Sequence, residues 1–297
     1  MRNKDLNILN YREIRITMTF YKYQGAGNDF LIADNRDGSL CLTTEQISAL
    51  CDRRYGVGAD GLMLLEGSGT YDFRMVYYNS DGSGGMMCGN GGRCIVAFAA
   101  DMGLTHFDFE AADGFHSAQI TEDDGRVKTV RLKMKDVTSV DYYDSLKGVA
   151  VPSRGCFMDT GTRHYVRILD RLDVCDVVAE GRDIRYNAVE LQPEGVNVNF
   201  VEASGDFLKV RTYEKGVEDE TFACGTGIVA SCVAAFKAGI RPSGVDAEGR
   251  VRFDVQARRD WLSVDFLPAD YLSGCVAEDV WLTGPATFVA EISSLVL

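Results

Sequence analysis

The sequence lacks the features that would mark a membrane-spanning or nucleic-acid-binding protein. Its longest apolar runs, such as those at residues 94–100 and 228–236, fall far short of the roughly 20 residues that a helix needs to cross a bilayer. No Lys/Arg-rich run is present, and a formal net charge of −13 would repel a phosphate backbone. We therefore expect a small-molecule partner, with no nucleic acid and no membrane.

The sequence is also poor in the residues that build metal sites and disulfide frameworks. It has three histidines and no Cys-x-x-Cys pair, and the close pairs Cys88/Cys94 and Cys224/Cys232 lack zinc-site spacing. Nine cysteines are an odd number for a disulfide framework, and the first residues hold no continuous apolar segment of the kind a secretion signal needs. These observations predict no metal, reduced thiols, a cytoplasmic location and a poorly ordered extension at residues 1–17.

An internal repeat is the most informative feature that is present. The segment MCGNGGRC, which contains Cys88, resembles ACGTGIVASC, which contains Cys224, and the two cysteines stand 136 positions apart. Tyr77 and Tyr213, each 11 positions before its cysteine, repeat the same offset. Two further pairs follow in the same order, GAGNDFLIAD with DTGTRHYVRILD and GVGADG with GVNVNF. Four blocks in one order predict a duplicated domain.

The local patterns predict an α+β fold. Helices are expected at residues 44–52, 92–102 and 227–237, and the last two are apolar almost all round, as a helix enclosed by a curved sheet would be. Short β-branched or aromatic runs predict strands at residues 30–33, 62–65, 73–78, 127–134, 165–169, 197–202 and 207–213. The expected architecture is two pseudo-symmetric duplicated domains, each a curved, mostly antiparallel sheet around a central helix.

The repeat also predicts how the chain divides. The boundary is expected near residues 136–151, and the C-terminal run is expected to return to the first half. Residues 18–136 plus 278–297 would then form an N-terminal half that carries Cys88, and residues 137–277 a C-terminal half that carries Cys224.

The cysteine at the start of each central helix is the strongest chemical signal. Free backbone N–H groups at a helix start bind anions such as a carboxylate and lower the pKa of a thiol there. If the halves face each other, the two thiols flank one carbon, so that one removes a proton and the other delivers one to the opposite face. The alternative is two buried cysteines at tight helix entries. Their repetition in both halves favours a shared function.

The motifs together resemble those of the diaminopimelate epimerase family. The resemblance spans about residues 20–290 in the family's order and spacing, through GAGNDF (25–30), GVGADG (56–61), YNSDG (78–82), MCGNGGRC (87–94), DTGTRHYV (159–166), GVNVNF (195–200) and YEKGVEDETFACGTG (213–227). It implies an active site in the cleft between the domains, closure around the substrate, no cofactor or metal, and a homodimer. The activity implied is interconversion of LL- and meso-diaminopimelate, which supplies lysine and peptidoglycan synthesis.

The resemblance also implies a role for each matching residue. Cys88 and Cys224 become the acid–base thiols, and His164 a residue that helps to poise them. The donors implied for the α-carboxylate of the reacting centre are Gly89, Asn90, Gly225 and Thr226. The residues implied to bind the distal end of the substrate are Asn28, Asn79, Asn197, Glu214 and Lys215.

Simpler interpretations exist for several of these residues. Asn28 and Asn79 lie beside residue types that are typical of turns. Glu214 and its neighbour are also consistent with a solvated pair at a strand end, and His164 with a hydrogen-bonded core histidine. Asn197 lies in an otherwise apolar strand, where a polar side chain needs a partner, so the substrate role is better supported there.

Two positions depart from the family pattern. Lys215 stands where an arginine is usual, and lysine lacks the planar two-pronged grip of arginine on a carboxylate. Arg163 stands where a proline commonly precedes the histidine, which alters that loop or adds a cation near the substrate. Two alternatives therefore stay open: a racemase or epimerase of another amino acid, of the proline or hydroxyproline type, and a non-catalytic amino-acid-binding homologue.

Overall fold

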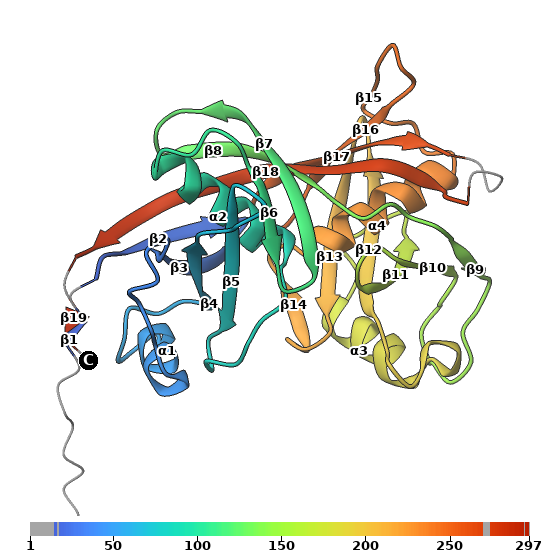
Figure 1. The fold of residues 1–297 in the computed structure, drawn as a ribbon. Helices are drawn as coiled ribbons and strands as arrows, with labels where there is room; N and C mark the ends of the chain where they lie inside the picture. Colours follow the sequence, from blue (N-terminus) through green and yellow to red (C-terminus); the bar gives the residue numbers. More distant parts are fainter. Residues whose placement is uncertain (1–14, 17, 270–273, 294, 297) are drawn as a thin grey trace, which may run out of the picture.

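The computed structural model describes residues 15–16, 18–269, 274–293 and 295–296, and its fold is α+β, as predicted. Figure 1 shows two halves side by side, the first in blue and green and the second in yellow and orange, with α2 (Gly89–Asp101) and α4 (Gly225–Lys237) among their strands. The extension expected at residues 1–17 lies outside the described residues, except for β1 (Arg15–Ile16), which pairs with β19 (Leu295–Val296).

The two halves share one scheme of strand pairing. In each, four strands pair in the order antiparallel, parallel, antiparallel. In the first half these are β2 (Phe20–Gly25), β3 (Asn28–Asp34), β4 (Gly61–Glu66) and β5 (Phe73–Asn79). In the second half they are β10 (Gly155–Asp159), β11 (Arg163–Ile168), β12 (Asn197–Ser204) and β13 (Phe207–Glu214). Two halves built to one scheme are what a duplicated domain predicts.

Further strands complete each half. The first adds β6 (Asp108–Ala111), β7 (Gly114–Asp123) and β8 (Val127–Lys133). The second adds β9 (Asp141–Tyr143), β14 (Asp219–Thr221), β15 (Gly244–Val245), β16 (Val251–Gln256) and β17 (Trp261–Pro268), with a short 3-10 helix at Val189–Leu191. The long strand β18 (Ala277–Ile292) pairs with β17 at its start and with β8 and β2 later, so it runs through both halves (Figure 1, red).

The strand register corrects one detail of the repeat. Leu62 of β4 lies opposite Tyr78, and Val198 of β12 lies opposite Tyr213. Tyr78 and Tyr213 both pack on the outer face of their sheets, whereas Tyr77 packs on the inner core. The counterpart of Tyr213 is therefore Tyr78 and not Tyr77, because a shift of one residue turns a strand side chain to the opposite face.

Three helices were predicted, and they differ from the prediction only at their ends. α1 (Thr44–Cys51) begins at a capping box formed by Thr43 and Gln46. α2 and α4 begin three and two residues earlier than predicted, so the glycines after each cysteine lie inside the first helical turn.

One helix, α3 (Val177–Asn187), was not predicted, and it corresponds to α1 in the second half. Gly181 interrupts its pattern, and a β-carbon there would lie 2.4 Å from the β-carbon of Tyr213. The glycine that hides this helix in the sequence is the residue that lets it pack on the sheet.

One hydrophobic core surrounds α2 and α4 and continues from one half to the other. Residues 89–99 of α2 are all buried, which confirms a helix enclosed on every side. Smaller clusters lie beneath α1 and α3. No helix in the described ranges is long and apolar enough to cross a membrane.

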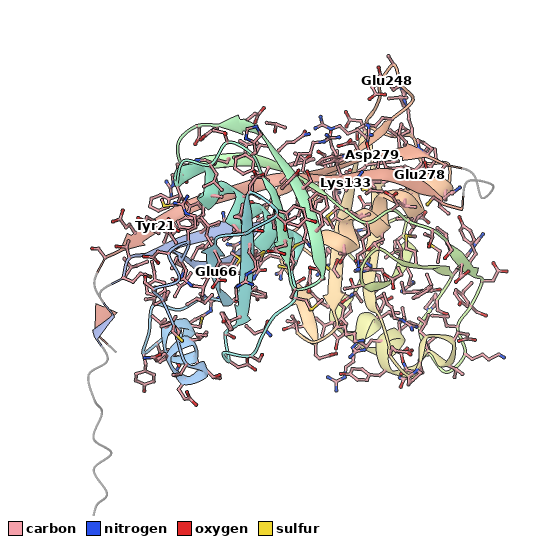
Figure 2. The ribbon with its side chains drawn as sticks, in the orientation of Figure 1. Tyr21, Glu66, Lys133, Glu248, Glu278 and Asp279 are labelled. Carbon is pink, nitrogen blue, oxygen red and sulfur yellow. The ribbon has the colours of Figure 1, made fainter. Side chains whose placement is uncertain are left out.

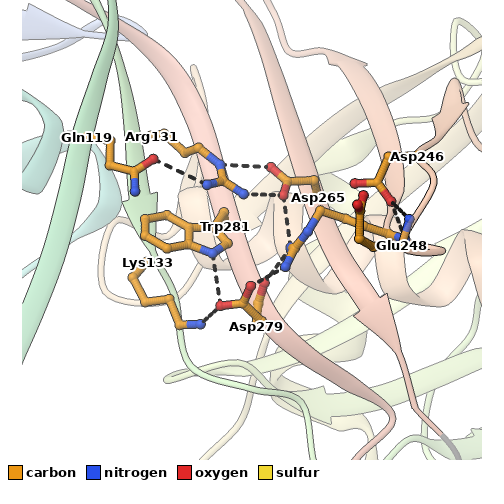
Figure 3. Close-up of polar contacts among 9 residues, drawn as sticks. Gln119, Arg131, Lys133, Asp246, Glu248, Asp265, Asp279 and Trp281 are labelled. Carbon is orange, nitrogen blue, oxygen red and sulfur yellow. Dashed lines mark hydrogen bonds and ion pairs between the residues drawn. The ribbon is translucent and has the colours of Figure 1, made fainter.

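A network of polar side chains connects the two halves on the outer side of their junction (Figure 3). Arg131 of β8 pairs with Asp265 of β17 at 2.5 Å and stacks over the ring of Trp281 at 4.2 Å. Asp265 also pairs with Arg250 at 3.0 Å, and Arg250 in turn pairs with Asp279 of β18. In Figure 2, Lys133 and Asp279 lie in the upper middle of the view, whereas Glu248 lies at the tip of the β15–β16 loop.

Candidate active site

The starts of α2 and α4 meet at the junction of the two halves. Cys88 is the N-cap of α2 and Cys224 is the N-cap of α4. The helices touch through Gly89 and Gly225, since a β-carbon on Gly225 would lie 3.4 Å from the Cα atom of Gly89. Glycine at both positions allows this approach. Two helix starts, each with free N–H groups and a positive end, are therefore brought together with their cysteines.

The two thiols have different hydrogen-bond partners. The Cys88 Sγ accepts from the Gly91 N–H at 3.3 Å, as a capping side chain does. The Cys224 Sγ lies 3.5 Å from the Oγ1 of Thr226. The equivalent cysteines thus differ in their immediate contacts, although both occupy the N-cap position: the Cys88 side chain caps its helix and that of Cys224 does not.

The pKa of both thiols is raised, which corrects the expectation of a lowered value. Burial raises the pKa of Cys88 most, the Gly91 N–H opposes it, and the charge of Glu214 raises it further. Burial also raises the pKa of Cys224, followed by Glu214, and the Thr226 hydroxyl opposes them. Loss of solvation outweighs the helix-start donors because the thiolate is the charged form.

The side chain of Asn90 links the two helix starts. Its Nδ2 donates to the carbonyl of Ala223, the residue before Cys224, at 3.0 Å. Its Oδ1 accepts from the Nη2 of Arg93 at 3.0 Å. Both ends of this amide are therefore bound within the protein, which fixes its orientation between the two helix starts.

His164 lies in the core beside Thr226 and is fully buried. Its Nε2 is 2.9 Å from the Oγ1 of Thr226 and 2.8 Å from that of Thr162. Its Nδ1 is 2.9 Å from the Nδ2 of Asn199, and an amide nitrogen can only donate. The imidazole therefore accepts at Nδ1 and carries its proton on Nε2, and burial lowers its pKa to about 3.

Asn199 is a site residue that the sequence interpretation missed. Its Oδ1 accepts from the Thr212 hydroxyl at 2.9 Å, so the orientation of its amide is fixed at both ends. The signal that pointed to Asn197, an asparagine in an apolar strand, applies equally two residues later on the same strand face.

The residues expected to bind the distal end lie on both halves. Asn28 donates to the carboxylate of Asp60, and Asn79 donates to the hydroxyl of Ser83 at 3.0 Å. Asn28 lies at the end of the β2–β3 turn, which contacts the second half, since a β-carbon on Gly27 would lie 2.8 Å from the ring of Phe222.

Asn197 and Glu214 belong to adjacent strands of the second half. The Oδ1 of Asn197 accepts from the backbone N–H of Lys215 at 2.8 Å, and its Nδ2 donates to the carbonyl of Arg163 at 3.1 Å. Glu214 is partly buried, and burial raises its pKa, whereas Lys215 is exposed. Arg163 pairs with Glu194 at 2.8 Å, so its guanidinium is held by an acidic partner.

Comparison with known proteins decides the family. The family model for diaminopimelate epimerase matches residues 20–140. Among curated relatives, the diaminopimelate epimerase of Chlorobaculum tepidum is 44% identical over 270 residues, covering 89% of this chain and 96% of that protein. The one from Flavobacterium psychrophilum is 42% identical over 281 residues, covering 92% and 99%. The chain belongs to the diaminopimelate epimerase family.

Solved structures with low sequence identity share the fold of this family member. A PhzF-family phenazine biosynthesis protein of Bacillus anthracis has a TM-score of 0.68 at 16% identity, covering 94% of this chain and 99% of that one. A probable proline racemase of Agrobacterium radiobacter K84 has a TM-score of 0.65 at 17% identity, covering 93% and 92%. Within the described ranges of this epimerase-family chain, no three His, Cys, Asp or Glu side chains are grouped to hold a metal ion.

Proposed function

We propose that this protein interconverts LL- and meso-diaminopimelate by a two-base mechanism in which Cys88 and Cys224 are the acid–base pair, without a cofactor. The observation that carries the proposal is the meeting of two helix starts, each capped by a cysteine, at the junction of two equivalent halves. The curated relatives that match most of this chain are diaminopimelate epimerases. The meso product would serve lysine and peptidoglycan synthesis.

The chemistry follows from the placement of the thiols. One cysteine, as thiolate, takes the α-hydrogen as a proton from one face of the substrate, and the C–H electron pair stays on carbon. The other cysteine, as thiol, gives its proton to the opposite face and becomes the thiolate. The configuration inverts, no electron leaves the system, and the roles of Cys88 and Cys224 exchange for the reverse reaction.

The carbanion requires support from positive charge. The free N–H groups of Gly89, Asn90, Gly225 and Thr226 stand at two helix starts, where a carboxylate is best accommodated. We assign the α-carboxylate of the reacting centre to these donors. A carboxylate held there would also bring the α-carbon next to both N-cap cysteines.

The distal amino-acid group of the substrate is assigned to Asn28, Asn79, Asn197, Glu214 and Lys215. Closure of the two halves around the ligand would bring these side chains into contact with the distal group. Buried and neutral, His164 can donate through Nε2 to Thr226 but cannot act as a cation there. Its proposed role is to fix the Thr226 hydroxyl beside the Cys224 thiol.

Proton exchange with solvent tests the function directly. The protein is incubated with LL-diaminopimelate in deuterated water, and we expect α-deuterium together with the meso isomer. Binding of the substrate without deuterium uptake would leave a non-catalytic homologue. Exchange on L-proline or trans-4-hydroxy-L-proline, with none on diaminopimelate, would refute the substrate assignment.

Single cysteine variants test the mechanism. We expect C88A and C224A each to lose epimerisation, because each removes the base on one face or the acid on the other. The matched control is C232A, which removes another buried thiol of α4 away from the helix start and should keep activity. A folded C88A or C224A protein with wild-type turnover would contradict the two-thiol mechanism.

A further inference from the structure

Arg93 is a buried arginine that forms no ion pair with any described residue. It lies in the first half of α2, is fully buried, and is among the largest side chains in the core. Its guanidinium makes three hydrogen bonds, from Nη1 to the Gly89 carbonyl at 3.0 Å, from Nη2 to the Asn90 Oδ1 at 3.0 Å and from Nε to the Pro285 carbonyl at 3.3 Å. All three acceptors are neutral, and no described Asp or Glu forms an ion pair with it.

A buried cation without a negative partner destabilises the folded protein, so such an arrangement is expected only where the charge has a function. A buried cation normally has a carboxylate beside it, because neutral acceptors replace only part of its lost hydration. Lys128, the buried lysine of β8, shows the usual solution, since it pairs with Asp101 at 2.7 Å and with Asp123 at 3.2 Å. Among the described residues, no carboxylate lies within ion-pair distance of Arg93, and the charge of Asp260 acts on it only from farther away.

Two glycines make room for this guanidinium. A β-carbon on Gly25 would lie 3.5 Å from the Nη2 of Arg93 and only 3.0 Å from the Asn90 carbonyl oxygen. A β-carbon on Gly284 would lie 3.2 Å from the Nε of Arg93. Gly25 and Gly284 lie on β2 and β18, which are neighbouring strands of one sheet, so the guanidinium packs closely against the backbone of both strands.

The hydrogen bonds of Arg93 connect it to the start of α2 directly and to the start of α4 through Asn90. Gly89 and Asn90 are the first residues of α2, directly after Cys88. The amide oxygen of Asn90 is held by Arg93, and the amide nitrogen of the same group donates to Ala223, directly before Cys224. Arg93 therefore fixes the group that connects the two helix starts.

We propose that Arg93 is the fixed cation of the site: its guanidinium holds Gly89 and Asn90 in place and offsets the negative charge of the Cys88 thiolate and of a carboxylate bound at the helix starts. The thiolate part concerns this chain alone, and the carboxylate part rests on the proposed function. Arg93 touches neither the reacting atoms nor the substrate, so it is a positioning residue. Its missing partner is the charge that appears during the reaction.

The other groups that act on Cys88 set the context for a test. Glu214 of β13 opposes its ionisation, and Arg93 favours it. Tyr77 of β5 and Cys224 of α4 also interact with it, and burial raises the pKa of both, so they are neutral near pH 7. Arg93 is the one positive group among these described side chains.

The first test measures the reactivity of the Cys88 thiol and not turnover. Alkylation of Cys88 by iodoacetamide is followed by peptide mass spectrometry between pH 6 and 10 in the wild type, R93Q, R93K and a control, K128M. The thiolate is the reactive form, so a rise of about one unit in its pKa slows the reaction about tenfold below that pKa. We expect R93Q to slow about tenfold and R93K to remain within about threefold of the wild type.

The control separates charge near Cys88 from loss of a buried cation in general. K128M removes a buried cation at the far end of α2 and should leave Cys88 alkylation unchanged. A folded R93Q whose alkylation profile matches that of K128M would overturn the proposal. If R93Q does not fold, R93K is the deciding variant. Lysine keeps the charge but cannot hold Gly89 and Asn90 together. The kcat of R93K should therefore fall at least tenfold. A folded R93K with wild-type kcat would equally overturn it.

Failure of the proposed function is seen separately, as absence of α-deuterium in the wild type. The Cys88 alkylation profile of R93Q reports on the cation whether or not diaminopimelate is the substrate.

Discussion

Gly227 is the position where packing and helix propensity predict opposite results. It lies in the first turn of α4, and a β-carbon there would lie 2.3 Å from the Oδ1 of Asn199 and 3.2 Å from the Cε1 of His164. The contact at 2.3 Å cannot be accommodated without a shift of Asn199. G227A should therefore displace the amide that orients the histidine.

The magnitude follows from competing contributions. Alanine stabilises a helix interior by up to about 1 kcal/mol relative to glycine. Displacing Asn199 leaves at least one of its buried partners, His164 or the Thr212 hydroxyl, without a hydrogen bond, at about 1–3 kcal/mol. The steric overlap adds about 1–3 kcal/mol. The net expectation is that G227A lowers the free energy of unfolding by about 1–5 kcal/mol.

The duplicated fold supplies a matched control for this change. Gly91 occupies the equivalent place in α2, three residues after Cys88, and a β-carbon there would meet nothing closer than 3.4 Å. G91A should therefore keep the stability of the wild type or gain up to about 1 kcal/mol. Urea unfolding followed by circular dichroism compares the three proteins. If G227A proves as stable as G91A, the packing argument at His164 is wrong.

Two further predictions concern charge. Burial lowers the pKa of His164 to about 3, so the unfolded state binds one more proton between about pH 3 and 6.5, and stability is lost as pH falls through this window. Between pH 6 and 5 the wild type should lose about 1 kcal/mol more than H164Q, measured by urea unfolding. Equal losses in the two proteins would contradict a buried, neutral His164. E214Q removes the charge that raises the pKa of both N-cap thiols, so their iodoacetamide alkylation at pH 8 should accelerate several-fold. E248Q, at the tip of the β15–β16 loop, should leave that rate unchanged, and equal rates in the two variants would contradict the role given to Glu214.

Much of the fold was predictable because its signals are local. A strand or helix pattern depends on residues within a few positions of one another, so the helices α1, α2 and α4 and the strands β3, β4, β5, β8, β11, β12 and β13 were expected close to their observed places. The other described strands, among them β2, β10 and the long β18, were not expected. The repeat of Cys-Gly-x-Gly placed one cysteine at each helix start, and both are N-caps. Helix α3 escaped because Gly181, which it needs for packing against Tyr213, weakens its pattern.

Properties that depend on the whole three-dimensional environment of a residue were not predictable. The helix start suggested a lowered pKa for Cys88 and Cys224, but the pKa of each is raised, because the extent of burial and the nearness of Glu214 depend on segments distant in sequence. The same holds for the hydrogen bond from Asn199 to His164, which joins neighbouring strands 35 positions apart.

The sequence by itself therefore determined the kinds of elements, the duplication and the pair of cysteines, since each is a pattern written along the chain. Only the tertiary structure decided the register of the halves, the contact between Gly89 and Gly225, and the absence of any described carboxylate within ion-pair distance of the Arg93 guanidinium. Distance, desolvation and hydrogen-bond partners arise when remote segments pack together, and no local pattern specifies them.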